Sequence, residues 1–142
     1  MAEPLLSGVN HVALAARDVD KTVQFYASAF GLEPSELAVP GEERNVLMFF
    51  PNGSFLHVID GSAMPATPRR ERDIEGNLLY EGDAIDHIAL FAADTDALQE
   101  IRGRLVALGA SAGDVIDTGG VATTVRFQDP DGRKLEVTAY NS

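Results

Sequence analysis

Short runs of apolar residues, with polar residues at alternate positions, predict several strands along the chain, and two stretches with helical spacing lie between them. Residues 9–15 form an apolar-rich run suited to a strand. Four further runs read as strands: 45–50, 54–59, 121–128 and 133–139. The apolar residues of the two predicted helices recur at helical spacing. They are Val19, Val23, Tyr26 and Phe30 in the first helix, and Leu98, Ile101, Leu105 and Leu108 in the second.

Residues that start and end helices flank both predicted helices. Asp18 or Asp20 can accept a hydrogen bond from the first turn of helix one, and Asp94 or Thr95 can do so for helix two. A glycine follows each apolar stripe, Gly31 in the first case and Gly109 in the second, and glycine readily adopts the left-handed backbone that ends a helix.

Two turns are predicted between the strands that follow the helices. Asn52-Gly53 favours a two-residue hairpin turn between the runs 45–50 and 54–59. In the second half, residues 129–132 read DPDG, where proline presets φ and glycine tolerates positive φ. We therefore expect a β-hairpin near the end of each half.

The sequence contains an internal repeat. Residues 9–18 read VNHVALAARD and residues 85–94 read IDHIALFAAD, and FLHVI at 55–59 corresponds to KLEVT at 134–138. Several anchors in the same order indicate duplication. Each copy reads as strand, helix and then three strands, so we predict an α+β fold of paired βαβββ modules. The 142 residues suit one domain, with module one at 8–60, a connecting loop at 61–84 and module two at 85–140.

Composition and charge restrict the classes of partner. The net charge of −11 argues against nucleic acid, whose phosphates require a basic face. No apolar run approaches the roughly 20 residues that cross a bilayer, and the N-terminus has no signal-peptide pattern. The absence of cysteine removes thiolate chemistry. We expect a cytoplasmic protein with a small-molecule substrate and without membrane or nucleic-acid partners.

The connecting loop holds three arginines in an otherwise acidic chain: Arg69, Arg70 and Arg72. The loop is long for a connector, so it is either a lid whose arginines grip an anionic group or a solvated crossover. Both interpretations stay open.

Polar side chains at equivalent places in the two copies predict a metal site. All three histidines of the chain and one glutamate alternate with apolar neighbours: His11, His57, His87 and Glu136. If the apolar neighbours pack beneath the helices, these four face the other side of the sheet. Taken singly, each of the four is better explained as an ordinary hydrogen-bonded residue of a strand than as a metal ligand. As a set of three imidazoles and one carboxylate, they favour a divalent cation, for which both groups are natural ligands.

The segments HVALAARDVDKTVQFYASAFGL, FLHVID, DHIAL and FQDPDGRKLEV resemble the vicinal oxygen chelate superfamily, which includes glyoxalase I, bleomycin-resistance proteins and extradiol dioxygenases. The resemblance covers about residues 8–140. It implies an open, cup-shaped, glyoxalase-like barrel around one divalent metal ion, which could be Zn, Ni, Fe, Co or Mn. The family's ligand positions fall on His11, His57, His87 and Glu136. A homodimer, with the ligands from one chain or shared between two, is also implied.

The resemblance leads us to expect a metal-dependent lyase or isomerase of the glyoxalase type. Such an enzyme chelates a small substrate through vicinal oxygens and stabilises an enediolate-like intermediate. Glu136 is the expected general base, with His57 as the second candidate. Residues of the same inward parity are expected to line the pocket. They are Phe55, Ile59, Ala89, Phe91, Thr124, Arg126 and Thr138.

Two alternatives remain. In an iron-dependent extradiol-type dioxygenase, His11, His87 and Glu136 would form the iron triad and His57 would be an acid–base residue. In a metal-free, bleomycin-resistance-like binding protein, the cup would sequester a cationic drug. The acidic balance supports this second alternative, whereas the complete ligand set speaks against it.

Overall fold

The computed structural model describes residues 4–38, 44–61, 71–72, 78–79 and 87–141. The chain divides into two units, Met1–Ala63 and Met64–Ser142, which are described separately below. Arg69 and Arg70 of the connecting loop lie outside the described residues, and only the backbone of Arg72 is described, so the choice between a lid and a solvated crossover stays open.

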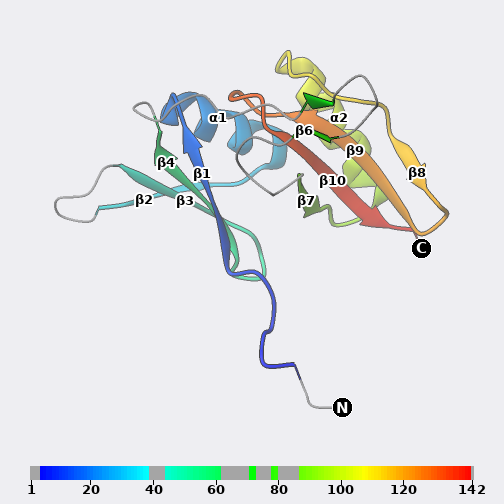
Figure 1. Cartoon of the computed structure of the whole chain (residues 1–142), viewed down its shortest axis with the longest axis horizontal. Coiled ribbons are helices and arrows are strands. Elements are labelled where there is room, and N and C mark those ends of the chain that lie inside the picture. Colours follow the sequence, from blue (N-terminus) through cyan, green and yellow to red (C-terminus); the bar gives the residue numbers. More distant parts are fainter. Residues whose placement is uncertain (1–3, 39–43, 62–70, 73–77, 80–86, 142) are drawn as a thin grey trace. The chain divides into compact units, whose positions relative to one another are not determined.

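The described residues of unit one form one helix and one four-stranded sheet (Figure 1). Its elements are β1 (His11–Ala16), α1 (Val19–Phe30), β2 (Pro34–Leu37), β3 (Asn45–Phe49) and β4 (Phe55–Asp60). The strand order is β1-β4-β3-β2, with β1 parallel to β4 and the remaining neighbours antiparallel.

Unit two repeats this arrangement. Its elements are β7 (Ile88–Phe91), α2 (Thr95–Ala107), β8 (Ile116–Thr118), β9 (Ala122–Gln128) and β10 (Lys134–Tyr140). The strand order is β7-β10-β9-β8, again with the first and last strands parallel. The prediction of an α+β fold with paired βαβββ modules is confirmed. Two short strands in the connecting segment, β5 (Glu71–Arg72) and β6 (Leu78–Leu79), pair with each other and were not predicted.

Local hydrogen bonds decide between the predicted helix caps. The Asp18 carboxylate accepts from the Lys21 backbone N–H, 3.0 Å away, and Asp94 accepts from the Ala97 N–H at 2.8 Å. Both satisfy a donor that the first helical turn leaves without an intrahelical partner. At the other end of α1, Gly31 adopts the left-handed conformation with φ 72°, as predicted.

The apolar stripe of each helix packs on its own sheet. In α1, Val19, Val23 and Tyr26 are buried and Phe30 is half-buried. In α2, Leu98 and Leu105 are buried, but Leu108 is 44% exposed because it lies at the C-cap, beyond the last full turn. The prediction for Leu108 was therefore wrong.

Both hairpins close with three-residue loops, whereas a two-residue loop was predicted for the first hairpin. The Gly53 N–H donates to the Phe50 carbonyl at 3.0 Å and the Phe50 N–H donates to the Ser54 carbonyl at 2.8 Å, which leaves a three-residue loop, 51–53. The prediction of a two-residue Asn52-Gly53 turn was wrong, because Pro51 starts the turn and Gly53 follows it with φ 90°. The loop 130–132 in unit two has the same bonds and the same positive-φ glycine, Gly132.

Burial alternates along the paired first and last strands. In β1 and β4 the buried residues are Leu14, Ala16, Leu56 and Val58, and in β10 they are Leu135, Val137 and Ala139. These residues face the helix of their own unit. We call the opposite side of each sheet its open face; the predicted site residues lie there, because they alternate with the buried ones.

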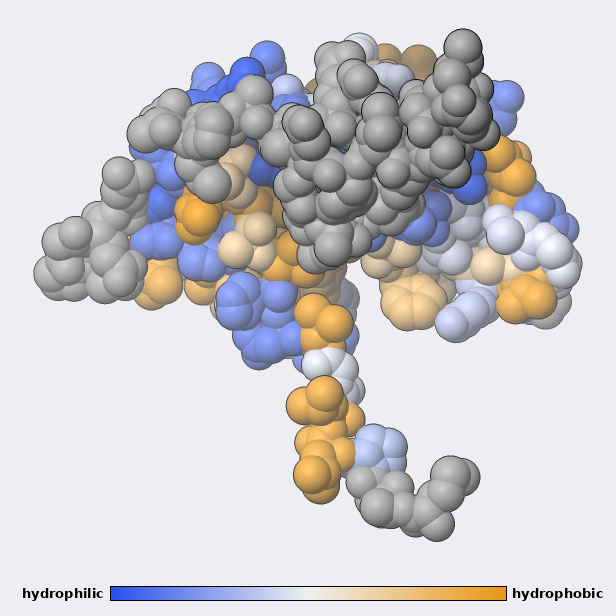
Figure 2. All heavy atoms as spheres, in the orientation of Figure 1, coloured by the Kyte–Doolittle hydropathy of each residue, from blue (hydrophilic) through white to orange (hydrophobic). Residues whose placement is uncertain are grey.

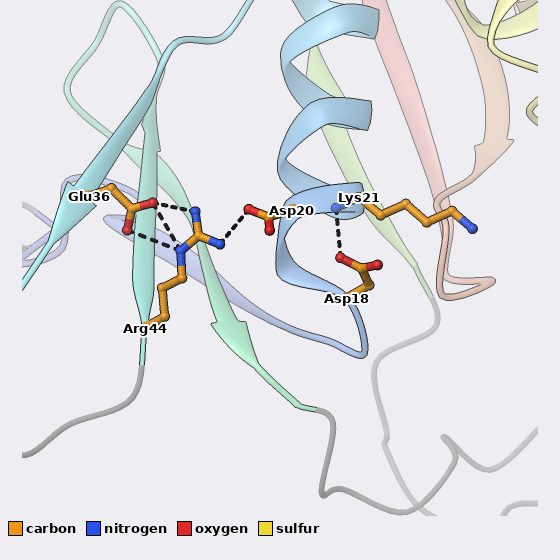
Figure 3. Close-up of polar contacts among 5 residues, drawn as sticks. All are labelled: Asp18, Asp20, Lys21, Glu36 and Arg44. Atoms are coloured by element: carbon orange, nitrogen blue, oxygen red, sulfur yellow. Dashed lines mark hydrogen bonds and ion pairs between the residues drawn. The ribbon is translucent and has the colours of Figure 1, made fainter.

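An ion-pair network links the start of α1 to the β2–β3 hairpin (Figure 3). The Arg44 guanidinium donates to both carboxylate oxygens of Glu36 and lies 2.5 Å from the Asp20 carboxylate. These hydrogen bonds lower the pKa of the Glu36 carboxyl below its ordinary value of 4.5. The network therefore joins a helix terminus to a sheet edge through one cation.

Residues 4–10, the described part of the segment before β1, are all exposed and do not join the core of unit one. Leu5, Leu6 and Val9 are 99%, 87% and 73% exposed, and Figure 2 shows apolar atoms along this N-terminal arm. Among the described residues, neither helix is long and apolar enough to cross a bilayer.

Candidate functional site

Unit one brings His11 and His57 together on its open face. His11 begins β1 and His57 is the third residue of β4; the parallel register pairs His57 with Ala13, two residues after His11. The two imidazole ring centroids are 5.9 Å apart. His11 is exposed and His57 is half-buried. Both rings are thus held next to each other by strand pairing.

Neighbouring side chains hold each of these rings. His11 Nδ1 lies 2.7 Å from Asn10 Oδ1, and His57 Nε2 lies 2.7 Å from Asn45 Oδ1. The His11 ring also stacks on Phe55, with centroids 4.7 Å apart and planes within 4° of parallel. The predicted pocket residue Phe55 therefore supports a predicted ligand.

Unit two brings His87 and Glu136 together. His87 Nε2 lies 3.5 Å from Glu136 Oε1, and the Glu136 side chain is only 18% exposed. Glu136 pairs with Ala89, two residues after His87. The register of this pair is the same as that of His11 and His57, so the duplicated sequence places its polar residues at equivalent points of both sheets.

Arg126 flanks the carboxylate on its other side. Its Nε lies 3.7 Å from Glu136 Oε2, and the two residues are directly paired across β9 and β10. The guanidinium side chain is 75% exposed. Glu136 therefore lies between an imidazole and an exposed cation.

The remaining predicted pocket residues of unit two share this open face. Thr124 and Thr138 are cross-strand partners whose hydroxyls are 3.0 Å apart. Phe91 is 73% exposed, and its ring centroid is 5.4 Å from that of Tyr140. Hydroxyls, a guanidinium and aromatic rings therefore surround the carboxylate.

Each unit supplies two of the four predicted metal ligands. Within the described part of each unit, no further His, Asp or Glu joins either pair to make a group of three. The meeting of the two pairs at one ion stays a prediction. Chemically, each pair offers donors that suit a borderline divalent metal: two imidazoles in unit one, and an imidazole with a carboxylate in unit two.

Sequence reasoning missed two residues of the open faces. Asn45 contacts His57 directly, and Tyr140 contacts Phe91. Strand parity could have found Tyr140, which follows Glu136 and Thr138 at alternate positions, whereas the contact of Asn45 with His57 depends on the β3–β4 register.

Known structures resemble the whole chain. A glyoxylase/bleomycin resistance protein/dioxygenase domain from Frankia sp. EAN1pec aligns with a TM-score of 0.75 at 20% identity, covering 96% of this chain and 94% of that one. Lactoylglutathione lyase from Agrobacterium tumefaciens aligns with a TM-score of 0.65 at 23% identity and 96% coverage of both chains. The fosfomycin resistance protein FosX from Listeria monocytogenes aligns with a TM-score of 0.66 at 21% identity, covering 95% and 94%. At these identities, the likeness shows the fold.

No curated protein sequence gives a significant match to the chain. The sequence model of one family, however, matches residues 8–137, which span both βαβββ modules. The chain belongs to the Glyoxalase/Bleomycin resistance protein/Dioxygenase superfamily.

Proposed function

We propose that the protein is a divalent-metal-dependent lyase or isomerase of the glyoxalase type, acting on a small substrate that carries two neighbouring oxygens. The observation that carries this proposal is the repeated pairing of ligand side chains. His11 and His57 in one unit, and His87 and Glu136 in the other, occupy the same register of equivalent strands. Membership of the superfamily supports it at the level of chemical class.

The donor set fits a borderline divalent ion such as Zn, Ni, Fe, Co or Mn. The Glu136 side chain is only 18% exposed and lies 3.5 Å from His87 Nε2, so both groups could bind the same cation. When bound, the ion supplies a Lewis acid that holds the substrate oxygens and stabilises negative charge on them.

The chain's own residues would handle the proton. Glu136 is proposed as the general base that takes a proton from the substrate carbon next to the chelated oxygens and returns it to the neighbouring carbon. His57 is the second candidate for this role. Because Arg126 lies 3.7 Å from Glu136, its guanidinium would hold the carboxylate in orientation or bind an anionic substituent of the substrate.

The apolar and hydroxyl residues of the open faces would bind the rest of the substrate. Phe55 and Phe91 offer ring surfaces, and Thr124 and Thr138 offer hydroxyls. We also propose a homodimer, supported by the exposed apolar side chains of the N-terminal arm.

Metal quantification tests the proposal directly. Wild-type protein purified without chelator should hold about one metal ion per site, and the variants His87→Ala and Glu136→Gln should hold little. Glu100→Gln is the matched control, because it removes a carboxylate that pairs only with the surface residue Arg104 in the contacts described, and it should retain the metal. Equal trace metal in all four proteins would defeat the proposal.

A second function, capture of a cationic molecule without a metal, is favoured by the net charge of −11. Calorimetry against a cationic glycopeptide in the presence of EDTA discriminates the two, because capture of this kind survives chelation. Oxygen uptake with catechols and ferrous iron tests the dioxygenase alternative, and the absence of uptake would exclude it.

A further inference from the structure

Arg126 makes the loosest ion pair of the arginines whose side chains the structure describes in unit two. Its Nε lies 3.7 Å from Glu136 Oε2, which is beyond the range of a normal hydrogen bond. The other arginines described in this unit each lie 3.2 Å or less from a carboxylate; the pairs are Arg102–Asp114, Arg104–Glu100 and Arg133–Asp129. The N–H groups of Arg126 are therefore the ones most available to a further anion.

The exposure of the two side chains supports this availability. The Arg126 side chain is 75% exposed, whereas the Glu136 side chain is only 18% exposed, so Glu136 covers little of the guanidinium. A guanidinium is a planar fork that binds a carboxylate through two parallel hydrogen bonds. Orientation of Glu136 through a 3.7 Å contact from Nε leaves this fork free to bind a ligand.

The charge of the whole chain makes a local cation necessary for binding an anion. With a net charge of −11, the protein repels anions at long range, so an anionic ligand needs a cation in direct contact. Arg126 provides that cation directly opposite Glu136 in the β9–β10 register. A divalent ion on Glu136 would offset the negative charge of its carboxylate, and an anion at Arg126 would then not be repelled by it.

The side chains beyond Glu136 are uncharged. The next row of cross-strand partners on the open face runs across four strands and consists of Ile116, Thr124, Thr138 and Phe91. Phe91 is 73% exposed and lies on β7, on the opposite side of β10 from Arg126. A ligand over Glu136 would therefore have a cation on one side and an aromatic ring, suited to an apolar group, on the other.

We infer that Arg126 is a specificity-determining residue that selects substrates carrying a carboxylate, with the apolar part of the substrate directed toward Phe91. The placement of the two neighbouring substrate oxygens on a metal ion rests on the proposed function. The selection of an anion rests on the position and exposure of Arg126.

Isothermal titration calorimetry of the full chain loaded with Zn²⁺ tests the inference with two probes, protocatechuate and its neutral amide. Both carry the same ring and the same two neighbouring oxygens, and they differ in the charge of one substituent. The ratio of the affinity for protocatechuate to that for the amide should be about 10-fold lower in Arg126→Gln than in wild type, because the variant loses a charge-assisted pair. Arg126→Lys keeps the charge but lacks the fork, so its ratio should lie between the two.

Two further variants serve as controls. Arg104→Gln removes the same charge from α2, where Arg104 pairs with Glu100, and it should leave the ratio unchanged. Phe91→Ala should weaken the binding of both probes to the same extent. An unchanged ratio in Arg126→Gln, or an equal fall in Arg104→Gln, overturns the inference. Weaker Zn²⁺ binding by Arg126→Gln with an unchanged ratio also overturns it, because Arg126 would then only orient Glu136.

The same titrations in EDTA separate this inference from the proposed function. Failure of wild type to hold Zn²⁺ overturns the proposed function. If the affinity ratio measured in EDTA still falls in Arg126→Gln, selection of an anion by Arg126 is supported without the metal. If wild type holds no Zn²⁺ and the ratio in EDTA is the same in both proteins, the inference is overturned as well.

Discussion

At the scale of single residues, the ion pair of Arg44 and Glu36 makes a pH-dependent contribution to unit one. Because hydrogen bonds from Arg44 are the largest cause, the pKa of the Glu36 carboxyl lies below 4.5. A lowered pKa in the folded state stabilises the protein fully above the unfolded value, and the stabilisation disappears as pH falls through the lowered pKa. Both side chains are exposed, so the effect is small and is screened by salt.

We predict that Arg44→Ala returns the pKa of Glu36 toward 4.5, which a titration of the carboxyl carbon by nuclear magnetic resonance would measure. The unfolding curves of wild type and variant should differ slightly at neutral pH and converge in acid. Arg102→Ala, which removes a cation paired with Asp114, should leave the Glu36 titration unchanged. An unaltered pKa in Arg44→Ala would contradict the assigned cause.

At this scale, the sequence predicted which face of the sheet each site residue occupies, but it did not predict the residues to which they hydrogen-bond. Strict alternation with buried Leu56 and Val58 is enough to put His57 on the open face. The contact of His57 with Asn45 depends on the β3–β4 register, which the hairpin length fixes and the sequence alone misassigned by one residue. The face on which His57 lies could therefore be predicted from the sequence, whereas its hydrogen-bond partner Asn45 required the structure.

At the scale of elements, the helices and the inner strands were predictable because their apolar periodicity is strong. The edge strands β2 and β8 were not located, since every residue of each is exposed and neither alternates between apolar and polar positions. Edge strands of this kind need only backbone pairing with a neighbour, and backbone pairing leaves no pattern in the side chains.

The repeated three-residue turns allow an element-scale prediction about stability. Gly53 and Gly132 have φ of 90° and 80°, and an added Cβ at either would meet no described atom within 4 Å beyond its own chain neighbours. Gly53→Ala and Gly132→Ala should therefore each destabilise the protein through backbone strain alone, by about 1–2 kcal/mol.

Gly103→Ala is the matched substitution, and it should change the free energy of unfolding in the opposite direction. Gly103 lies inside α2 with equally open space around its Cβ position, so alanine should stabilise the helix by about 1 kcal/mol. Urea unfolding of the three variants measures all of these differences. Destabilisation by Gly103→Ala, or neutrality of both turn variants, would contradict the backbone argument.

At the scale of the whole molecule, duplication explains why each unit supplies two of the four predicted metal ligands. One βαβββ module has two parallel-paired strands, β1 with β4 or β7 with β10, and each such pair presents one pair of donors. Two donors seldom hold a borderline divalent ion firmly, whereas four are the usual number for such ions in proteins. A shared ion would therefore couple the stabilities of the two units.

This coupling gives a prediction that separates one shared ion from an ion held by one unit alone. A metal present at 100 times its dissociation constant should stabilise wild type by about 2.7 kcal/mol, or roughly 10 °C in the midpoint of thermal unfolding. His11→Ala in unit one and Glu136→Gln in unit two should each abolish most of that increase, because a 100-fold weaker site retains only about 0.4 kcal/mol at the same metal concentration. If the metal were held by one unit, the variant in the other unit would keep the full increase. Differential scanning calorimetry with and without the ion, on the two variants and on Glu100→Gln, therefore tests whether the two halves of the repeat act on one ion.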